Sequence, residues 1–432
     1  MALFSQRTSK IDTENAFKIG PHIVKVEGSG KKVVKFNLGE PDFDLPKYIG
    51  DEIKRQIDLG NTHYCDPQGI PTLRKTLAAH LTKSRGITVT PDRIVVFPGG
   101  KPPIGLCQQA YCDPGDEVIY PSPGFPIYES FIRYVDAVPV PLHLKEELGF
   151  SFTGDDLAPL ITPKTKLIIL NFPSNPTGGV ATREQLEGIA KVIEEKCSPD
   201  VRVYSDEIYE HILFDGSKHI SIAAIGGMAK RTVIASGHSK SFAWTGGRVG
   251  YAAFPTVEEA QVFKNLNINY FSCIPPYNQE AARVALESPE CDVEVGKMVR
   301  AFEERRDYVV PALNAIEGIK CQNPKGAFYV FPNISGICEQ LGAFELFKGL
   351  PDDLRKKLSP STLFQMFLLY EYGVATMDRK SFGKIGAENC HYLRLSIANK
   401  LEELKEGIAL IEKASQDEDG FAAFVKKGEN LI

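Results

Sequence analysis

Short apolar runs alternate with longer helical patterns through the middle of the chain. The runs are rich in β-branched residues, and the stretches between them, such as Arg183 to Lys196, have the spacing of apolar positions that favours a helix. Strands separated by helices are typical of a mostly parallel sheet covered on both faces. The predicted strands are Ile94 to Phe97, Glu117 to Tyr120, Leu167 to Leu170, Val201 to Ser205 and Thr232 to Ala235.

The pattern changes after Ser288, where fewer and longer elements follow. The tail after Lys413 is polar, and we expect it to pack weakly. Between Ser288 and this tail the predicted elements are a helix through Arg305, a strand around Ala327 to Val330, and helices near Ser361 to Tyr372 and Leu401 to Ala414.

Composition places the chain among globular proteins. Its 432 residues, 43% of them hydrophobic, suffice for a large core and a second lobe. A net charge of −5 argues against nucleic acid or a membrane surface as the main partner. No apolar stretch reaches transmembrane length, and the N-terminus lacks the pattern of a secretion signal. Nine cysteines without CxxC pairs indicate reduced thiols in a cytoplasmic protein.

Candidate chemistry begins at Lys240, which lies among small residues in the segment 239–250. Arg248 follows it among glycines. A lysine in this setting suits a Schiff base to an aldehyde cofactor, and the arginine suits that cofactor's phosphate. The glycines would let the backbone approach the ligand closely.

Two further segments extend this chemistry. The strand at Val201 to Ser205 leads into Asp206, a carboxylate that needs a cation if it is buried. The protonated ring nitrogen of pyridoxal phosphate is such a cation. The turn Gly99-Gly100-Lys101 lies between a strand and a helical run, where backbone amides bind anions. All of these motifs follow strands, where ligands bind in parallel sheets.

Arg394 lies in an alternating apolar run, Tyr392 to Ala398. An unpaired charge there would be costly, and a substrate carboxylate would satisfy the guanidinium with two hydrogen bonds. An arginine that bridges two helices is the alternative interpretation.

Together these segments resemble the fold type I pyridoxal-phosphate enzymes, specifically the class I/II aminotransferases, from about Asn37 to about Lys413. The resemblance implies an α/β fold, in which helices sandwich a mostly parallel seven-stranded sheet in a large domain. A smaller α+β domain would combine the N-terminal arm and the C-terminal third. The expected divisions are 1–45 for the arm, 46–287 for the large pyridoxal-phosphate-binding domain and 288–432 for the small domain, with an insertion near 334–360.

The resemblance also assigns roles at the cofactor. Lys240 would carry pyridoxal 5′-phosphate and then move the substrate proton, Asp206 would pair with the ring nitrogen, and Tyr209 would hydrogen-bond the phenolic oxygen together with Asn175. The other implied cofactor contacts are Gly99, Gly100, Lys101, Phe125, Arg248 and, across a homodimer interface, Tyr64.

Substrate recognition is implied for Arg394, Gly39, Asn175 and Lys101. Arg394 would bind the α-carboxylate, to which the Gly39 backbone also contributes. In one branch, similar to bacterial aspartate and prephenate aminotransferases, the lysine of the GGK turn reaches a distal carboxylate. Lys101 would permit aspartate or glutamate as donor and 2-oxoglutarate as acceptor.

The chain departs from the family pattern at three places. Glu14, on the arm, would repel a second carboxylate. Gly237 stands where the family often has a phosphate-binding serine, which leaves Ser236 and Ser239 as alternatives. Asp378 and Arg379 replace a common Pro-Gly pair; we hypothesise that they line or gate the substrate pocket, and a solvated charged loop is the alternative.

The predicted function is a pyridoxal-phosphate-dependent aminotransferase that moves the amino group of an L-amino acid to a 2-oxo acid in a homodimer with shared active sites. Lyases, cyclases and amino-acid oxidases of this fold keep the same key residues and remain alternatives. A non-catalytic sensor module fused to a DNA-binding domain is a distant one, because about 35 residues before Asn37 are too few for that domain.

Overall fold

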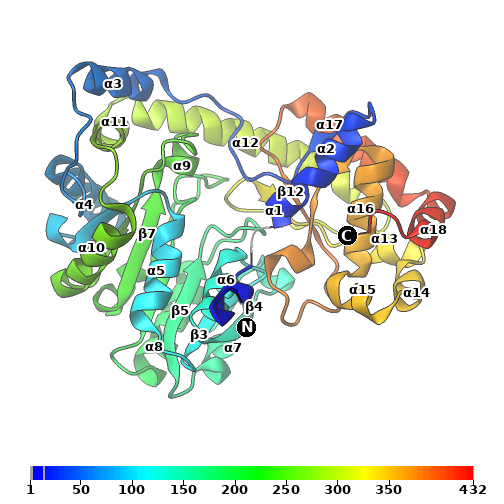
Figure 1. Ribbon diagram of the computed structural model, residues 1–432, viewed down its shortest axis with the longest axis horizontal. Coiled ribbons are helices and arrows are strands. Elements are labelled where there is room, and N and C mark those ends of the chain that lie inside the picture. Colours follow the sequence, from blue (N-terminus) through cyan, green and yellow to red (C-terminus); the bar gives the residue numbers. More distant parts are fainter. Residues whose placement is uncertain (1–2, 13–14, 432) are drawn as a thin grey trace.

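A seven-stranded sheet dominates one half of the structure, a computed structural model that describes residues 3–12 and 15–431 (Figure 1). Every neighbouring pair of strands is parallel except those made by β8, which is antiparallel to β2 and β7. The predicted mostly parallel sheet is therefore confirmed. The order across it is β2 (Ile94–Phe97), β8 (Gly250–Ala253), β7 (Thr232–Gly237), β6 (Arg202–Asp206), β5 (Thr165–Asn171), β3 (Glu117–Ser122) and β4 (Val138–His143).

Side chains along each strand alternate between two apolar layers. On β5, Leu167 and Ile169 enter one cluster of buried residues, whereas Ile168 and Leu170 enter another on the opposite face. This two-residue period is what a strand covered on both faces requires. One layer is formed with α5 (Lys101–Tyr111), α6 (Ile127–Tyr134) and α10 (Val257–Phe271), and the other with α4 (Pro71–Arg85), α7 (Gly154–Leu157), α8 (Arg183–Lys196) and α11 (Pro276–Glu287).

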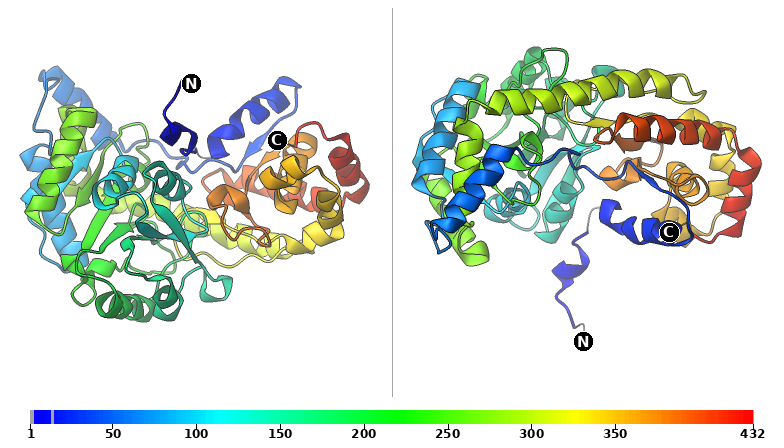
Figure 2. Two further views of the ribbon diagram at one scale, coloured as in Figure 1. Left: turned by 60° about the horizontal axis from the view of Figure 1, so that its bottom comes forward. Right: turned by 90° about the horizontal axis from the view of Figure 1, so that it is seen from above.

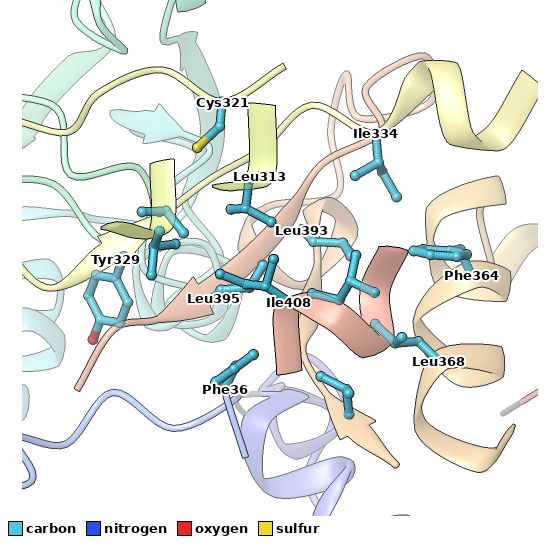
Figure 3. Packing of buried hydrophobic residues seen from close by; sticks show 14 of the residues in the cluster. Phe36, Leu313, Cys321, Tyr329, Ile334, Phe364, Leu368, Leu393, Leu395 and Ile408 are labelled. Atoms are coloured by element: carbon cyan, nitrogen blue, oxygen red, sulfur yellow. The ribbon is translucent and has the colours of Figure 1, made fainter. Parts of the chain in front are cut away.

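A second body gathers around a small antiparallel sheet in the order β11 (Met377–Asp378), β12 (Leu393–Ser396), β9 (Tyr329–Val330). Figure 3 shows its apolar core, in which Leu393 and Leu395 lie among side chains from the surrounding helices. Its helices are α12 (Cys291–Asn314), α13 (Ser335–Gln340), α14 (Ala343–Lys348), α15 (Asp352–Lys357), α16 (Pro360–Tyr372), α17 (Leu401–Ser415) and α18 (Glu418–Lys427).

The N-terminal segment crosses to this second body. Strand β1 (Val34–Lys35) pairs in parallel with β10 (Val374–Ala375), so residues from opposite ends of the chain share one ladder. Figure 2 shows α2 (Gly20–Gly28) beside the C-terminal helices, and α12 running between the two bodies. The remaining α-helices of the described chain are α1 (Asn15–Lys18), α3 (Lys47–Asp58) and α9 (His238–Ser241).

Most predicted elements are present, with shifted ends. Helix α8 has the predicted bounds, whereas α12 continues past the predicted end at Arg305 to Asn314. The weakly packed tail is a wrong prediction: α18 buries Phe421, Phe424 and Val425. Residues 334–360 form three short helices. The domain divisions at residues 45 and 287 stay a prediction.

The described residues contain neither a membrane-spanning helix nor a disulfide bond. Within residues 3–12 and 15–431, no helix is long and apolar enough to cross a membrane. All nine cysteines lie in these ranges, and each is free of a disulfide. Most of their neighbourhoods are apolar, and burial raises the pKa of Cys338, for example, to about 12.

Candidate active site

A cavity of about 560 Å³ lies where the parallel strands of the large sheet end. Strands β5, β6 and β7 end at the same edge of the sheet, so their following residues converge on it. The cavity takes in ten of the predicted site residues, contributed by both bodies of the structure. They are Gly39, Gly100, Lys101, Phe125, Asn175, Asp206, Tyr209, Lys240, Arg248 and Arg394.

Lys240 reaches the cavity from α9, the short helix that follows β7 directly. Its Nζ donates a hydrogen bond to the Gly39 carbonyl at 2.5 Å and lies 5.8 Å from the centre of the Phe328 ring. Gly39 cannot carry a side chain, because a Cβ there would lie 2.1 Å from the Tyr329 hydroxyl oxygen. The amine is therefore held against the N-terminal segment that closes the cavity.

Asp206 ends β6 and points into the same cavity. Its Oδ2 accepts a hydrogen bond from the Tyr128 hydroxyl at 2.6 Å, and Oδ1 accepts one from the Ile208 amide. Burial raises the pKa of this carboxyl to about 6, because few groups compensate for the lost water. A cation beside Asp206, such as the protonated ring nitrogen of pyridoxal phosphate, would offset that cost.

The opposite end of the cavity suits a phosphate. Arg248 donates to the carbonyls of Thr245 and Pro98, at 2.8 and 3.1 Å, which fixes its guanidinium beside the N-terminus of α5. Gly99 has φ of 97° and packs under Arg248, where a Cβ would meet NH2 at 2.0 Å. A fixed arginine beside exposed helix amides is a suitable donor set for a phosphate.

Arg394 lies on β12 with 5% of its surface exposed. Its NH1 donates to Asn175 Oδ1 at 3.1 Å, NH2 donates to the Asn37 carbonyl, and the rings of Tyr329 and Phe382 cover its faces. The Nε has no hydrogen-bond partner, and within the described ranges no carboxylate forms an ion pair with Arg394. A carboxylate ligand in the cavity would complete the interactions of this buried cation.

Lys101 is a further basic residue of the cavity. Its Nζ lies 5.6 Å from the centre of the Phe17 ring and 5.7 Å from that of Phe125. Phe125 meets Tyr128 edge to face, so its ring is held in place beside the residue that binds Asp206. The lysine and Arg394 thus supply two positive groups in one cavity.

Other predicted residues lie elsewhere. Tyr64 is 89% exposed and outside the cavity, Gly99 packs behind its wall, and Glu14 lies outside the described residues. Asp378 and Arg379 are also absent from the wall. The alternative of a solvated loop is wrong for them, because both side chains are buried: Asp378 accepts from Thr362 and Ser381, and Arg379 donates to Ser122 and Gly383.

Backbone packing explains why Gly237 stands where the family often has a phosphate-binding serine. At Gly237 a Cβ would lie 3.0 Å from the Cα of Gly250, its partner in the antiparallel pairing of β7 with β8, so this position favours glycine. Ser236 and Ser239 both line the cavity, but the Ser236 hydroxyl donates to Glu210 Oε1 at 2.7 Å. Ser239 is therefore the better placed of the two for a ligand.

Several cavity residues carried no distinct signal in the sequence, among them Asn171, Tyr128, Thr245 and Tyr329. Tyr329 contacts two predicted site residues. Its hydroxyl lies 2.8 Å from that of Tyr209, and its ring packs against the Arg394 guanidinium. A tyrosine in a short apolar strand predicts only core packing. Its position next to Arg394 depends on the pairing of β9 with β12, which no local pattern reveals.

Comparison with known proteins decides the family. The family model of aminotransferases of class I and II matches residues 31–411. The chain belongs to this family. A probable aspartate/prephenate aminotransferase of Aquifex aeolicus is 36% identical to it, with 96% of this chain and 98% of the relative covered. An aspartate/prephenate aminotransferase of Cereibacter sphaeroides is 34% identical, with coverage of 95% and 98%.

A solved structure agrees with this assignment. The aspartate aminotransferase of Rhizobium meliloti superposes on this aminotransferase with a TM-score of 0.85 and 31% sequence identity, covering 96% of this chain and 99% of that one. The protein is thus a pyridoxal-phosphate-dependent transaminase, and amino acids and 2-oxo acids are its substrates. The lyase, cyclase, oxidase and sensor alternatives are not supported.

Proposed function

We propose that the cavity around Lys240 is the transamination site and that the aminotransferase prefers acidic amino acids. The observation that carries the site is the convergence of a lysine amine, a buried carboxyl and a buried, incompletely bonded arginine in one cavity. When bound, pyridoxal phosphate supplies an aldehyde for the amino group and a ring that stabilises negative charge at the substrate Cα.

Each protein group around that ring would have a separate role in binding or proton transfer. Asp206 holds the proton on the ring nitrogen, and the Tyr128 hydroxyl orients its carboxylate. Asn175 and Tyr209 would hydrogen-bond the phenolic oxygen, while Arg248 and the amides at Gly100 and Lys101 would hold the phosphate. Lys240 Nζ would hold the aldehyde carbon of the cofactor, and as a free amine it would move the proton at the substrate Cα.

Arg394 and Lys101 would orient the substrate. Arg394 binds the α-carboxylate with two hydrogen bonds, and the Gly39 backbone completes this contact. Lys101, which lines the same cavity, would bind a second carboxylate, so aspartate or glutamate would be the donor and 2-oxoglutarate an acceptor. The names of the Aquifex and Cereibacter relatives support an acidic substrate and add prephenate as a candidate acceptor.

An absorbance titration tests this proposal. Single L-amino acids are added to the purified holoenzyme without a 2-oxo acid. We expect the visible cofactor band to give way to a band near roughly 330 nm, at the lowest concentrations for aspartate and glutamate. Loss of ammonia or pyruvate instead would contradict amino transfer.

A lysine variant separates substrate choice from catalysis. In Lys101→Ala the half-saturating concentration should rise for aspartate and glutamate but not for alanine, because only the acidic donors carry the second carboxylate. The matched control is Lys264→Ala, on α10, which lies outside the cavity wall. An equal change for all donors would refute a role in selecting acidic substrates and would leave the transamination site itself intact.

We further propose a homodimer in the cytoplasm. Tyr64 is 89% exposed in the single chain, and it would gain a partner if it reached the phosphate in a second subunit's cavity. Nine free cysteines are consistent with a reducing compartment.

A further inference from the structure

A second group of polar residues lies behind the cavity, between α4 and the segment that follows β6. Arg85 Nε donates to Glu207 Oε2 at 2.9 Å, and its NH2 lies 2.5 Å from Glu210 Oε2. All three side chains are almost fully buried. Two carboxylates therefore face one guanidinium, and His219 Nε2 lies 2.9 Å from Glu207 Oε2, so the group has a net charge of −1 when its histidines are neutral.

Two imidazoles face the open side of this group. His80, on α4, has its Nε2 3.5 Å from Glu210 Oε2, and His211 has its Nε2 3.9 Å from the same oxygen. The three ligand atoms all lie within 4.8 Å of one another. Nitrogen, nitrogen and a carboxylate oxygen are a ligand set that zinc accepts.

These separations fit metal ligands better than hydrogen bonds. An N–H···O hydrogen bond spans about 2.7–3.2 Å, and His80 Nε2 has no hydrogen-bond partner among the described residues. Two ligand atoms of a tetrahedral zinc, with bonds of about 2.0–2.2 Å, are about 3.3–3.5 Å apart. Small side-chain rotations of His211 would bring the third atom into that range.

The remaining atoms of Glu210 leave one oxygen for a metal. Its Oε1 accepts from the hydroxyls of Ser236, at 2.7 Å, and Tyr251, at 3.3 Å. Its Oε2 receives Arg85 NH2 and keeps its other lone pair for a metal, while Glu207 anchors Arg85 through two nitrogens. Side-chain exposures of 20% for His80 and 29% for His211 leave both imidazoles reachable from solvent.

We propose that His80, Glu210 and His211 form a binding site for a divalent transition metal of the zinc type. The site is distinct from the cofactor cavity and does not depend on the proposed substrate. It nevertheless touches the cavity wall, because Glu210 follows Tyr209 in sequence and binds the Ser236 hydroxyl.

Cobalt binding to the holoenzyme tests the site. The protein is freed of metal with a chelator, dialysed and titrated with Co²⁺, whose visible bands report a tetrahedral environment, and Zn²⁺ binding is measured by calorimetry. We expect one equivalent of metal per chain. His80→Ala and His211→Ala should each weaken binding by more than about 100-fold, the upper end of the effect of losing a second-shell partner.

The control variant is His22→Ala, because His22 lies on α2 and contacts Tyr370 instead of the cluster. It should bind metal as the wild type does. Both cluster variants keep Arg85, Glu207 and Glu210, and an unchanged cofactor band shows that they fold. Absence of Co²⁺ bands and Zn²⁺ heats in the wild type, or unchanged affinity in both cluster variants, would overturn the proposal.

Discussion

The buried carboxyl of Asp206 lowers the stability of the cofactor-free protein and at the same time offers a binding group for the cofactor. The fold removes its carboxyl from water and supplies hydrogen bonds from Tyr128 and the Ile208 amide, yet the pKa still rises to about 6. In the cofactor-free protein the charged form is therefore costly at neutral pH. The bound cofactor would recover that cost through its ring nitrogen.

The first prediction concerns the pH dependence of stability. In the cofactor-free protein the folded pKa of Asp206 is about 6, above the unfolded value of about 3.9. The folded state then binds the proton more tightly, so stability is highest below the unfolded pKa and falls as pH rises through 6, by about 3 kcal/mol in total. Roughly 1–2 kcal/mol of this loss lies between pH 5 and 7.5.

Urea unfolding of the cofactor-free wild type and of Asp206→Asn, at roughly pH 5 and pH 7.5, measures this loss of stability. The amide does not titrate, so the variant should lack this part of the loss and be the more stable protein at pH 7.5. It should also bind pyridoxal phosphate less tightly. Parallel pH profiles for the two proteins would contradict the prediction.

The second prediction concerns Arg394. Arg394→Gln removes a charged fork, and a hydrogen bond to a charged group contributes about 1.5–3 kcal/mol. We expect kcat/KM to fall about 10- to 100-fold for every amino donor, acidic or neutral, with the cofactor band retained. Steady-state kinetics of Arg394→Gln, beside the exposed-surface control Arg183→Gln, measures this. A loss confined to acidic donors would contradict the assignment.

Single residues were predictable where the chemistry is unusual for its surroundings. A lysine among small residues, a carboxylate at a strand end and an arginine in an apolar run each conflict with ordinary packing, and all three line the cavity. Tyr329 and Tyr128 were not predictable, because a tyrosine in an apolar run is compatible with a plain core. Only tertiary pairing brings their hydroxyls to Tyr209 and Asp206.

At the scale of elements, β8 is the feature that shapes the phosphate end. It runs against its neighbours and brings Gly250 onto the loop that follows β2. A Cβ on Gly250 would lie 2.3 Å from the Gly99 carbonyl carbon and 2.7 Å from the Gly100 amide nitrogen. Both are backbone atoms, so the loop would have to move.

The third prediction follows from that contact. Gly250→Ala should displace the amides at the start of α5 and raise the Kd of pyridoxal phosphate by about tenfold or more, the effect of one lost charge-assisted hydrogen bond. Binding of pyridoxal, which lacks the phosphate, should change little. Fluorescence titration with both ligands measures this, and Gly246→Ala, with no atom within 4 Å of the new Cβ, is the control. Equal weakening of both ligands would contradict it.

Prediction of elements succeeded where apolar periodicity was long and failed where it was broken. Helix α8 has an amphipathic repeat and a Thr182 capping box, and its bounds were correct. Strand β4 contains Pro139 and Pro141 and was missed, because prolines suppress the strand signal. Helix α18 was missed because its charged first turn hides the apolar face that docks on α16.

At the scale of the whole molecule, the single chain leaves Tyr64 outside the cavity that it is predicted to serve. The fourth prediction tests whether a second copy supplies it. Mixed subunits of Lys240→Ala and Tyr64→Ala should form hybrid dimers with one intact site each. If assembly is random, about a quarter of wild-type activity returns. Activity after joint refolding, compared with each variant alone, measures this.

The matched control pairs Lys240→Ala with Arg248→Ala. Both residues line the cavity of the same chain, so no hybrid of these variants contains an intact site and activity should stay low. Recovery in this control, or its absence in the Tyr64 mixture, would argue against shared sites.

The fold class was predictable as a whole because the alternation of strands and helices covers more than a hundred residues of the large sheet. The second body was harder, since its strands have two to four residues and pair between distant segments. Its arrangement depends on the core shown in Figure 3, which draws side chains from both ends of the chain.

The pairing of β1 with β10 has a consequence for synthesis in the cell. As the ribosome releases the chain, Val34 and the adjoining Phe36 emerge early, but the strand that receives them ends at Ala375, and Phe36 packs on Gly407 later still. The apolar N-terminal segment therefore remains without its partner strand while the large sheet forms. Closure of the cavity by Gly39 is then among the last events of folding, so a nascent or truncated chain has no complete site.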